Sequence, residues 1–408
     1  MKTTKRRDFI KKIGVTAAGV AVLPTLTSCS SEVKKEKLSE TIVTSLQEKV
    51  ELKKYSSKAK QLVNEATCID MLSTYGGFIT QRDGMGIGRY WENTPSSFTQ
   101  EDYNFVRAAG INVFGWGKTV TTYDGMLQFM AAQNGIIASN PNYFERIDTK
   151  AKLKNFHTSE KIGMLITCQD SKHFKTLDDV NLFYALGQRV SQLTYNGKNR
   201  IGCGAFEDVD TGITDYGKQI VQRMNQVGMA VDVSHCGDKT TIGAIEACEN
   251  TPALITHGAC RSISKGLARA KTDEAIKAMA KTGGVIGMPI LRFMISEKEP
   301  VSIDNFFNHI EHVAQLVGIE HVGIGSDQGL YTEDYGTREW RKNRLENAPA
   351  KYQCHTNEDY LLTIEGLNHP FRIYDIAEGL LKRGYKDEHV KMVLGENFKR
   401  ALIKIFKH

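Results

Sequence analysis

The sequence lacks the signatures of several common protein classes. Its eight cysteines follow neither a zinc-ribbon spacing nor a recognisable disulfide framework. No glycine-rich dinucleotide turn follows the first predicted strand. The apolar run from Ile13 to Leu23 is too short to span a membrane as a mature helix. These absences argue against a zinc ribbon, a disulfide scaffold and a dinucleotide-binding domain.

The chain also has little net charge beyond its N-terminus. The formal net charge is +6, and residues 1–29 carry six Lys/Arg and one Asp, which is +5. The remainder, +6 minus +5, is close to neutral at +1. The basicity therefore belongs to the first residues, and no nucleic-acid partner is implied.

Those first residues have the order of an export signal. A twin-arginine pair, Arg6-Arg7, precedes the apolar run, and Leu26-Thr27-Ser28-Cys29 resembles a lipobox. We expect residues 1–29 to be a twin-arginine lipoprotein signal and residues 30–59 a polar spacer. The protein would then be periplasmic and anchored to a membrane through lipid on Cys29. Seven cysteines remain after Cys29, and this odd number leaves at least one thiol unpaired.

From about residue 60 the chain alternates apolar runs with amphipathic helical stretches and shows no antiparallel hairpin signal. This pattern predicts an α/β fold, a single (β/α)8 TIM-type barrel over residues 60–408, with an open doubly wound sheet as the alternative. The eight predicted strands are Ala66–Met71, Ile111–Gly117, Ile162–Gln169, Val190–Tyr195, Met229–His235, Pro252–His257, Gly283–Pro289 and His321–Asp327.

Polar residues stand where several of these strands end. The stretch Gly228–Arg261 predicts a β-α-β unit whose two parallel strands end on His235 and His257, and the eighth strand ends on Asp327. Asp170 follows the third strand. Because the carboxyl ends of barrel strands meet at one mouth, these side chains should converge there. Imidazole and carboxylate are zinc ligands, so the pattern favours a metal-dependent hydrolase.

The sequence resembles the membrane (renal-type) dipeptidase family of zinc peptidases from about Ile162 to the C-terminus. The segments that carry the resemblance are LGQRVSQLTYNGKNRIGCG, GITDYG, NQVGMAVDVSH, THGACR, RAKTDE, GGVIGM, HVGIGSD and VLGENFKR. The resemblance implies a (β/α)8 barrel that holds a metal pair and hydrolyses dipeptides.

The resemblance also assigns roles to individual residues. His235 and His257 match two metal ligands, and Asp327 matches the aspartate that assists proton transfer. Arg269 matches the arginine that binds the substrate carboxylate, if one residue is inserted before it. Tyr195 stands where some members place a histidine on the substrate carbonyl. We expect Tyr195 to act in catalysis and substrate binding, and Asn196 beside it to bind substrate.

Three positions depart from the family pattern. Leu72 and Thr74 stand where the family has a histidine and an aspartate that bind metal, and Gln169 stands where it has the bridging glutamate. Leucine and threonine are not useful zinc ligands, and a neutral amide cannot offset the charge of two dications. We therefore expect one zinc ion or none, with His235 and His257 as ligands and Asp327 or Asp170 completing the site.

These observations favour a hydrolase that acts on a dipeptide, or on a similar small amide with a free carboxylate, with Asp327 as the general acid or base. Two alternatives keep the fold. One is a metal-independent isomerase, tautomerase or lyase on an amino-acid-like substrate, and the other is a non-catalytic binding lipoprotein. A homodimer is possible in each case. Outside the site, we expect His309 and His312 to lie on the surface of an amphipathic helix, and the loop Tyr331–Pro370 to overhang the barrel mouth.

Overall fold

The structure is a computed structural model that describes residues 52–74, 91, 94–298, 300–330 and 363–408. The predicted export signal and the lipid attachment site at Cys29 lie outside these residues. So does most of the loop expected over the mouth, residues 331–362. The six cysteines in the described part of the chain are buried and form no disulfide.

Eight parallel strands form a closed barrel. Each pairs with the next in the chain, β9 pairs with β1, and β2 pairs with β4, which closes the ring. The predicted single barrel is confirmed, and the open sheet is wrong. The barrel strands are β1 (Ile69–Thr74), β2 (Val113–Lys118), β4 (Ile162–Cys168), β5 (Gln188–Gln192), β6 (Ala230–Asp232), β7 (Leu254–Ile255), β8 (Val285–Met288) and β9 (Val322–Ile324).

A short ninth strand, β3 (Phe144–Arg146), was not predicted from the sequence. It pairs with Ile162–Met164 of β4, while β5 pairs with the later residues of β4 from Ile166. Strand β3 therefore extends one edge of β4 and takes no part in closing the barrel.

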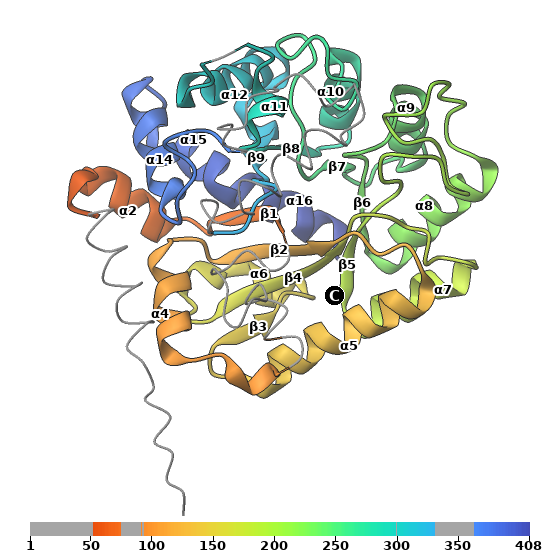
Figure 1. Cartoon of the computed structure of the whole chain (residues 1–408), viewed down its shortest axis with the longest axis horizontal. Helices are drawn as coiled ribbons and strands as arrows, with labels where there is room; N and C mark the ends of the chain where they lie inside the picture. Colours follow the sequence, from red (N-terminus) through yellow and green to blue (C-terminus); the bar gives the residue numbers. More distant parts are fainter. Residues whose placement is uncertain (1–51, 75–90, 92–93, 299, 331–362) are drawn as a thin grey trace, which may run out of the picture.

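Helices cover the outside of the strands (Figure 1). Many begin at a Thr or Ser whose side chain accepts a hydrogen bond from a backbone N–H of the first turn, as Thr122, Thr214 and Thr272 do. The helices are α2 (Ser57–Glu65), α4 (Gln100–Ala108), α5 (Tyr123–Ser139), α6 (Lys150–Lys154), α7 (Leu177–Leu186), α8 (Asp215–Val227), α9 (Asp238–Ala247), α10 (Asp273–Lys281), α11 (Arg292–Ile295), α12 (Ile303–Val317), α14 (Arg372–Lys382), α15 (Asp387–Lys391) and α16 (Asn397–Ile405).

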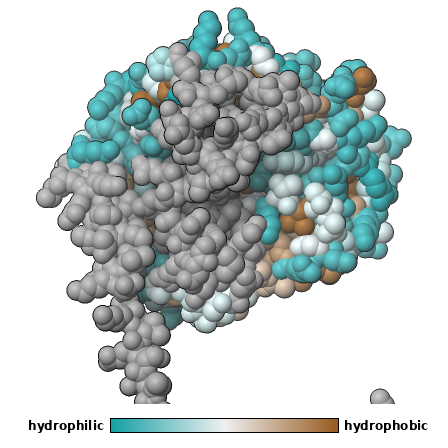
Figure 2. All heavy atoms as spheres, viewed as in Figure 1, coloured by the Kyte–Doolittle hydropathy of each residue, from teal (hydrophilic) through white to brown (hydrophobic). Residues whose placement is uncertain are grey.

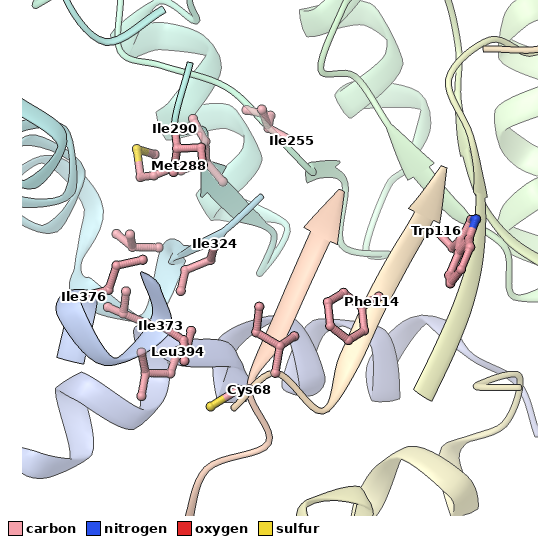
Figure 3. Packing of buried hydrophobic residues seen from close by; sticks show 14 of the residues in the cluster. Cys68, Phe114, Trp116, Ile255, Met288, Ile290, Ile324, Ile373, Ile376 and Leu394 are labelled. Atoms are coloured by element: carbon pink, nitrogen blue, oxygen red, sulfur yellow. The ribbon is translucent and has the colours of Figure 1, made fainter. Parts of the chain in front are cut away.

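Alternate strand residues divide the core into two layers. The inner layer gathers strand residues such as Ile69, Leu165 and Val285 around Phe398 of α16. Because most barrel strands contribute to this one cluster, it fills the barrel interior. The outer layer lies between strands and helices, where Ile324 of β9 lies near α14 (Figure 3).

The described domain starts before residue 60. Tyr55 is buried and its hydroxyl donates to Asp375 Oδ2 at 2.5 Å, while α2 begins at Ser57. The predicted spacer boundary at residue 59 therefore falls inside α2. In one view the described surface is largely hydrophilic, with apolar residues in smaller groups (Figure 2). None of the described helices has the length and apolar character of a membrane span.

Strand β1 contains a register shift that bears on the site. Asp70 pairs with Phe114 and Ser73 with Trp116, so Met71 and Leu72 together face Gly115. This is a β-bulge, and it leaves Leu72 pointing toward β2 and β4. A Cβ added to Gly117 would lie 2.5 Å from Leu72 Cδ1 and 2.4 Å from Thr167 Oγ1.

We expect Gly115→Ala to destabilise the protein by about 1–3 kcal/mol, because the added carbon has no room. A Cβ on Gly115 would lie 2.0 Å from the Met71 carbonyl oxygen. Urea denaturation followed by circular dichroism measures the change. Gly135→Ala in α5 is the matched control, since its nearest contact would be Pro95 Cγ at 3.7 Å. The control should be neutral or stabilising by up to about 1 kcal/mol. Equal stability of Gly115→Ala and Gly135→Ala would contradict the conclusion that the bulge leaves no room for a side chain at position 115.

Candidate active site

Two histidines meet at the carboxyl ends of β6 and β7. His235 lies three residues after β6, and His257 lies two residues after β7. Both side chains are buried, and their Nε2 atoms are 3.0 Å apart. The β-α-β unit expected from the sequence, with α9 between the strands, is what brings them together.

The outer nitrogen of each imidazole has a hydrogen-bond partner that sets its tautomer. His235 Nδ1 lies 2.7 Å from Asn196 Oδ1, an amide oxygen that can only accept, so Nδ1 carries the hydrogen. His257 Nδ1 lies 2.9 Å from Thr256 Oγ1. The Thr256 hydroxyl donates to Asp232 Oδ2 at 2.7 Å, so its oxygen accepts from His257 Nδ1. Both Nε2 atoms are thereby left with lone pairs that face each other.

The electrostatic surroundings keep both imidazoles neutral. Burial holds the pKa of His235 and His257 well below its usual range, and repulsion from the Arg269 guanidinium adds to the effect. A neutral imidazole is the form that binds a metal ion. The two imidazoles are therefore candidate metal ligands.

Arg269 lies beside the histidines and is buried. Its Nη1 donates to the Ser234 carbonyl and its Nη2 to the His257 carbonyl at 2.8 Å. The guanidinium therefore ties together the segments that follow β6 and β7. Its expected contact with a substrate carboxylate stays a prediction.

Tyr195 and Asn196, which follow β5, both contact His235. The ring of Tyr195 stacks on the imidazole with centroids 4.4 Å apart and planes 20° apart. The Asn196 amide oxygen is engaged by His235 Nδ1. In this arrangement both residues orient His235, and their expected roles in catalysis and substrate binding stay predictions.

The two aspartates are not gathered with the histidines. Asp170 is buried, accepts from Asn199 Nδ2 at 2.9 Å and lies 3.5 Å from Lys172 Nζ, and burial raises its pKa. Asp327 is half-buried, and its backbone N–H donates to the Leu72 carbonyl. In the part of the chain that the structure describes, no three His, Cys, Asp or Glu side chains are grouped to hold a metal. The expected ligand set is therefore assembled only as its histidine pair.

Asp327 has an unusual backbone conformation. Its φ is +56°, in the left-handed region that few residues other than glycine occupy. Such backbone strain is often found at functional sites and is maintained by the surrounding contacts. The conformation is compatible with the catalytic role that the sequence assigned to Asp327.

The three altered family positions offer few donor atoms for a metal ion. Leu72 offers no donor atom and packs beside Thr167 in the barrel. Thr74 ends β1, and its side chain lies outside the described residues. Gln169 follows β4 and is buried, and its side chain is a neutral amide. The histidine pair and the neutral amide of Gln169 are thus the described donors at the positions that the resemblance assigns to metal ligands, and the expectation of one zinc ion or none stays a prediction.

Sequence reasoning missed several residues that support the site. Asp232 and Thr256 were not singled out, although Asp232 precedes His235 by three positions and Thr256 directly precedes His257. That proximity to the strand-end histidines was the available signal. Lys271 was also missed: it is buried, and its Nζ donates to the Cys236 carbonyl at 2.8 Å.

The surface placement expected for His309 is wrong. His309 is buried; its Nε2 lies 2.8 Å from the Ile295 carbonyl, and its Nδ1 accepts from the Cys260 N–H at 3.0 Å. It joins α12 to segments that follow β7 and β8, a contact that helical periodicity alone cannot reveal. His312 is partly buried and lies 2.8 Å from Asp273 Oδ1.

A closed (β/α)8 barrel with its polar site at the carboxyl ends of the strands has the architecture of barrel enzymes. Within that class, the family model described as membrane dipeptidase (peptidase family M19) matches residues 82–336, well over half of the chain. The chain belongs to this family.

Individual relatives are distant. Dipeptidase verJ from Clonostachys rogersoniana is 27% identical over 224 residues, covering 54% of this chain and 49% of that protein. The chain spans about half or less of the length of the curated relatives that it matches. A solved amidohydrolase from Pseudomonas aeruginosa has a TM-score of 0.70 and 24% identity, over 86% of this chain and 99% of that one.

A metallo peptidase from Rhodobacter sphaeroides, solved with a phosphinate mimic of the dipeptide L-Ala-D-Ala, has a TM-score of 0.65. It is 13% identical, over 84% of this chain and 99% of that one. At these identities the solved structures establish the fold of the chain.

Proposed function

We propose that the protein is a dipeptidase-like hydrolase whose site binds one divalent cation between His235 and His257. The observation that carries the proposal is the 3.0 Å distance between the two Nε2 atoms, each of which has a lone pair in the tautomer that its ring's Nδ1 partner favours. Two lone pairs at this distance repel unless a cation lies between or beside them. Zinc is the expected ion, because it favours neutral imidazole ligands. When bound, such an ion supplies a Lewis acid that polarises the carbonyl of an amide.

The proposed substrate is a dipeptide, or a similar small amide with a free carboxylate. Two buried cationic side chains support this choice. Arg269 contacts the segments of both histidines, and Lys271 binds the Cys236 carbonyl next to His235. Burial lowers the pKa of Lys271 to about 7, and Arg269 remains charged. The resulting positive potential favours an anionic group at the mouth. The related metallo peptidase with a bound dipeptide mimic supports the same substrate class.

Two residues of this chain have proposed roles in the reaction. Asp327 would accept and return a proton at its carboxylate, because it lies at the mouth in a conformation held by its neighbours. Tyr195 covers one face of His235 and limits the access of water to it. Family membership does not favour the metal-independent isomerase or the binding lipoprotein. We also propose export by the twin-arginine route and anchoring through Cys29, which rest on the sequence alone.

The test is the metal content of the mature protein purified without chelator. We expect about one zinc per chain, lost in His235→Ala. His312→Ala is the matched control: this histidine of α12 bonds Asp273 of α10 and Ser262 of the segment before α10, so the variant should keep the metal. Metal-free native protein would overturn the cation site. Loaded protein that cleaves no member of a broad dipeptide panel would overturn the substrate assignment.

A further inference from the structure

A buried carboxylate connects the two strands that carry the histidines. Asp232 ends β6 and is buried. Its Oδ1 accepts from the Ser234 hydroxyl at 2.5 Å and from the backbone N–H groups of Ser234 and Thr256 at 2.9 and 3.1 Å. Its Oδ2 accepts from the Thr256 hydroxyl at 2.7 Å. Among the described residues, the hydrogen-bond partners of Asp232 are Ser234 and Thr256, so the carboxylate acts on His257 through Thr256.

The hydroxyl hydrogen of Thr256 has one favourable destination. It can point to Asp232 Oδ2 at 2.7 Å, to His257 Nδ1 at 2.9 Å or to Ser234 Oγ at 3.2 Å. The carboxylate is closer and charged, so it takes the hydrogen. The Ser234 hydroxyl gives its own hydrogen to Asp232 Oδ1. The remaining partner of Thr256 Oγ1, His257 Nδ1 at 2.9 Å, must therefore donate.

We infer that Asp232 and Thr256 are positioning residues that hold His257 as the Nδ1–H tautomer and keep its Nε2 lone pair available to a cation. The inference rests on the proposed one-cation site and extends it beyond the two ligands. The aspartate fixes the hydroxyl, the hydroxyl fixes the ring hydrogen, and the ring then presents a lone pair toward His235. The backbone supports the same geometry, because the His257 N–H donates to Ser234 Oγ at 3.1 Å.

Removing the Thr256 hydroxyl should switch His257 to the other tautomer. In Thr256→Val nothing accepts from Nδ1, so the ring hydrogen moves to Nε2. There it can donate to His235 Nε2, which is 3.0 Å away and carries a lone pair. The two histidines would then bond to each other and compete with the cation. Asp232→Asn should act in the same direction, because an amide can donate to Thr256 Oγ1 and turn the hydroxyl hydrogen toward His257 Nδ1.

The first measurement reads the tautomer without any metal. Full-length mature protein, labelled with 15N-histidine and stripped with chelator, gives two-bond 1H–15N correlations for each ring. We expect protonated Nδ1 on His257 in the native protein and in Thr256→Ser, and protonated Nε2 in Thr256→Val and Asp232→Asn. Circular dichroism checks that each variant folds. If Thr256→Val does not fold, Asp232→Asn provides the same tautomer measurement. Protonated Nε2 on His257 in the native protein would overturn the inference.

The second measurement is a cobalt(II) titration followed by visible absorption. We expect Thr256→Val to bind cobalt about 10–100-fold more weakly than the native protein. Thr256→Ser keeps the hydroxyl and should bind cobalt like the native protein. Thr282→Val, which removes a buried hydroxyl bonded to Met279 and Ala253, should bind like the native protein. Unchanged affinity and tautomer in Thr256→Val would overturn the inference while leaving the proposed function standing. Native protein with the Nδ1–H tautomer and no cobalt binding would instead overturn the cation site and support the tautomer assignment.

Discussion

Replacement of Arg372 by methionine is expected to cost about 3–5 kcal/mol of folding free energy, because it leaves a buried carboxylate without its counter-charge. Arg372 on α14 and Asp70 on β1 are both buried, with 3.5 Å between Nη2 and Oδ2. Asp70 also accepts from Ser326, from the backbone N–H at 2.8 Å and from the hydroxyl at 2.5 Å. The pair therefore joins the first strand, the residues after the last strand and a C-terminal helix.

The same guanidinium supports the backbone that follows Asp327. Its Nη1 donates to the Gly329 carbonyl at 2.8 Å, and its Nη2 donates to the Gln328 carbonyl at 3.2 Å. Ser326 on the other side is held by Asp70. These contacts fix both neighbours of a residue whose φ is +56°. Loss of Arg372 should therefore weaken the fold and loosen the segment that carries Asp327.

The destabilisation should depend on pH. Burial raises the pKa of Asp70, and the charge of Arg372 opposes this shift. Without Arg372 the folded-state pKa rises further. The folded state then holds the proton more tightly than the unfolded state, so the free energy of unfolding falls as pH rises above the unfolded value of about 3.9. Arg372→Met should thus be closer to the native protein in stability at pH 4 than at pH 7.

Urea unfolding at several pH values measures these effects. Lys58→Met is the matched control, because Lys58 and Asp387 form an exposed ion pair, and it should cost less than about 1 kcal/mol. The double variant Asp70→Asn/Arg372→Met should lose less stability than Arg372→Met alone, since it buries no charge. A loss in Arg372→Met no larger than in Lys58→Met would show that the pair is not structural.

Replacement of Gln169 by glutamate is expected to tighten cation binding by more than about 100-fold. Loss of a residue that only hydrogen-bonds a metal ligand already changes the affinity by roughly 10–100-fold, and a new ligand should have a larger effect. The family places a bridging glutamate at this position, and two histidines with one glutamate form a common catalytic zinc set. Gln169 directly follows β4 and is buried at the same end of the barrel as the histidines. Its backbone carbonyl accepts from Gln192 Nε2 at 2.8 Å, a bond that the substitution leaves intact.

Cobalt(II) titration compares the native protein, Gln169→Glu and the uncharged control Gln169→Met. Only the carboxylate should raise the affinity, and the cobalt spectrum should change as a third ligand is added. If Gln169→Glu and Gln169→Met bind cobalt equally, Gln169 does not face the cation and the correspondence with the family position fails. A gain in Gln169→Glu alone would show that position 169 faces the proposed cation site.

Local patterns were sufficient for much of the fold and part of the site. Apolar runs alternating with amphipathic stretches predicted the barrel strands. The meeting of His235 and His257 followed from one β-α-β unit, because parallel neighbouring strands end at the same edge. Residue identity alone gave the expectation of one zinc ion or none, because Leu72, Thr74 and Gln169 differ from the ligands of the family pattern, and this expectation stays a prediction.

The sequence by itself thus determined the barrel and its histidine pair, because each depends on patterns among neighbouring residues. Only the tertiary structure decided the contacts between distant segments. Arg372 meets Asp70 across 302 positions (372 − 70), and the bulge that turns Leu72 inward requires Gly115 on the next strand. The tautomer of His257 depends on the Thr256 hydroxyl and on Asp232 of the neighbouring strand. These contacts join residues that are far apart in the sequence, so local sequence periodicity cannot predict them.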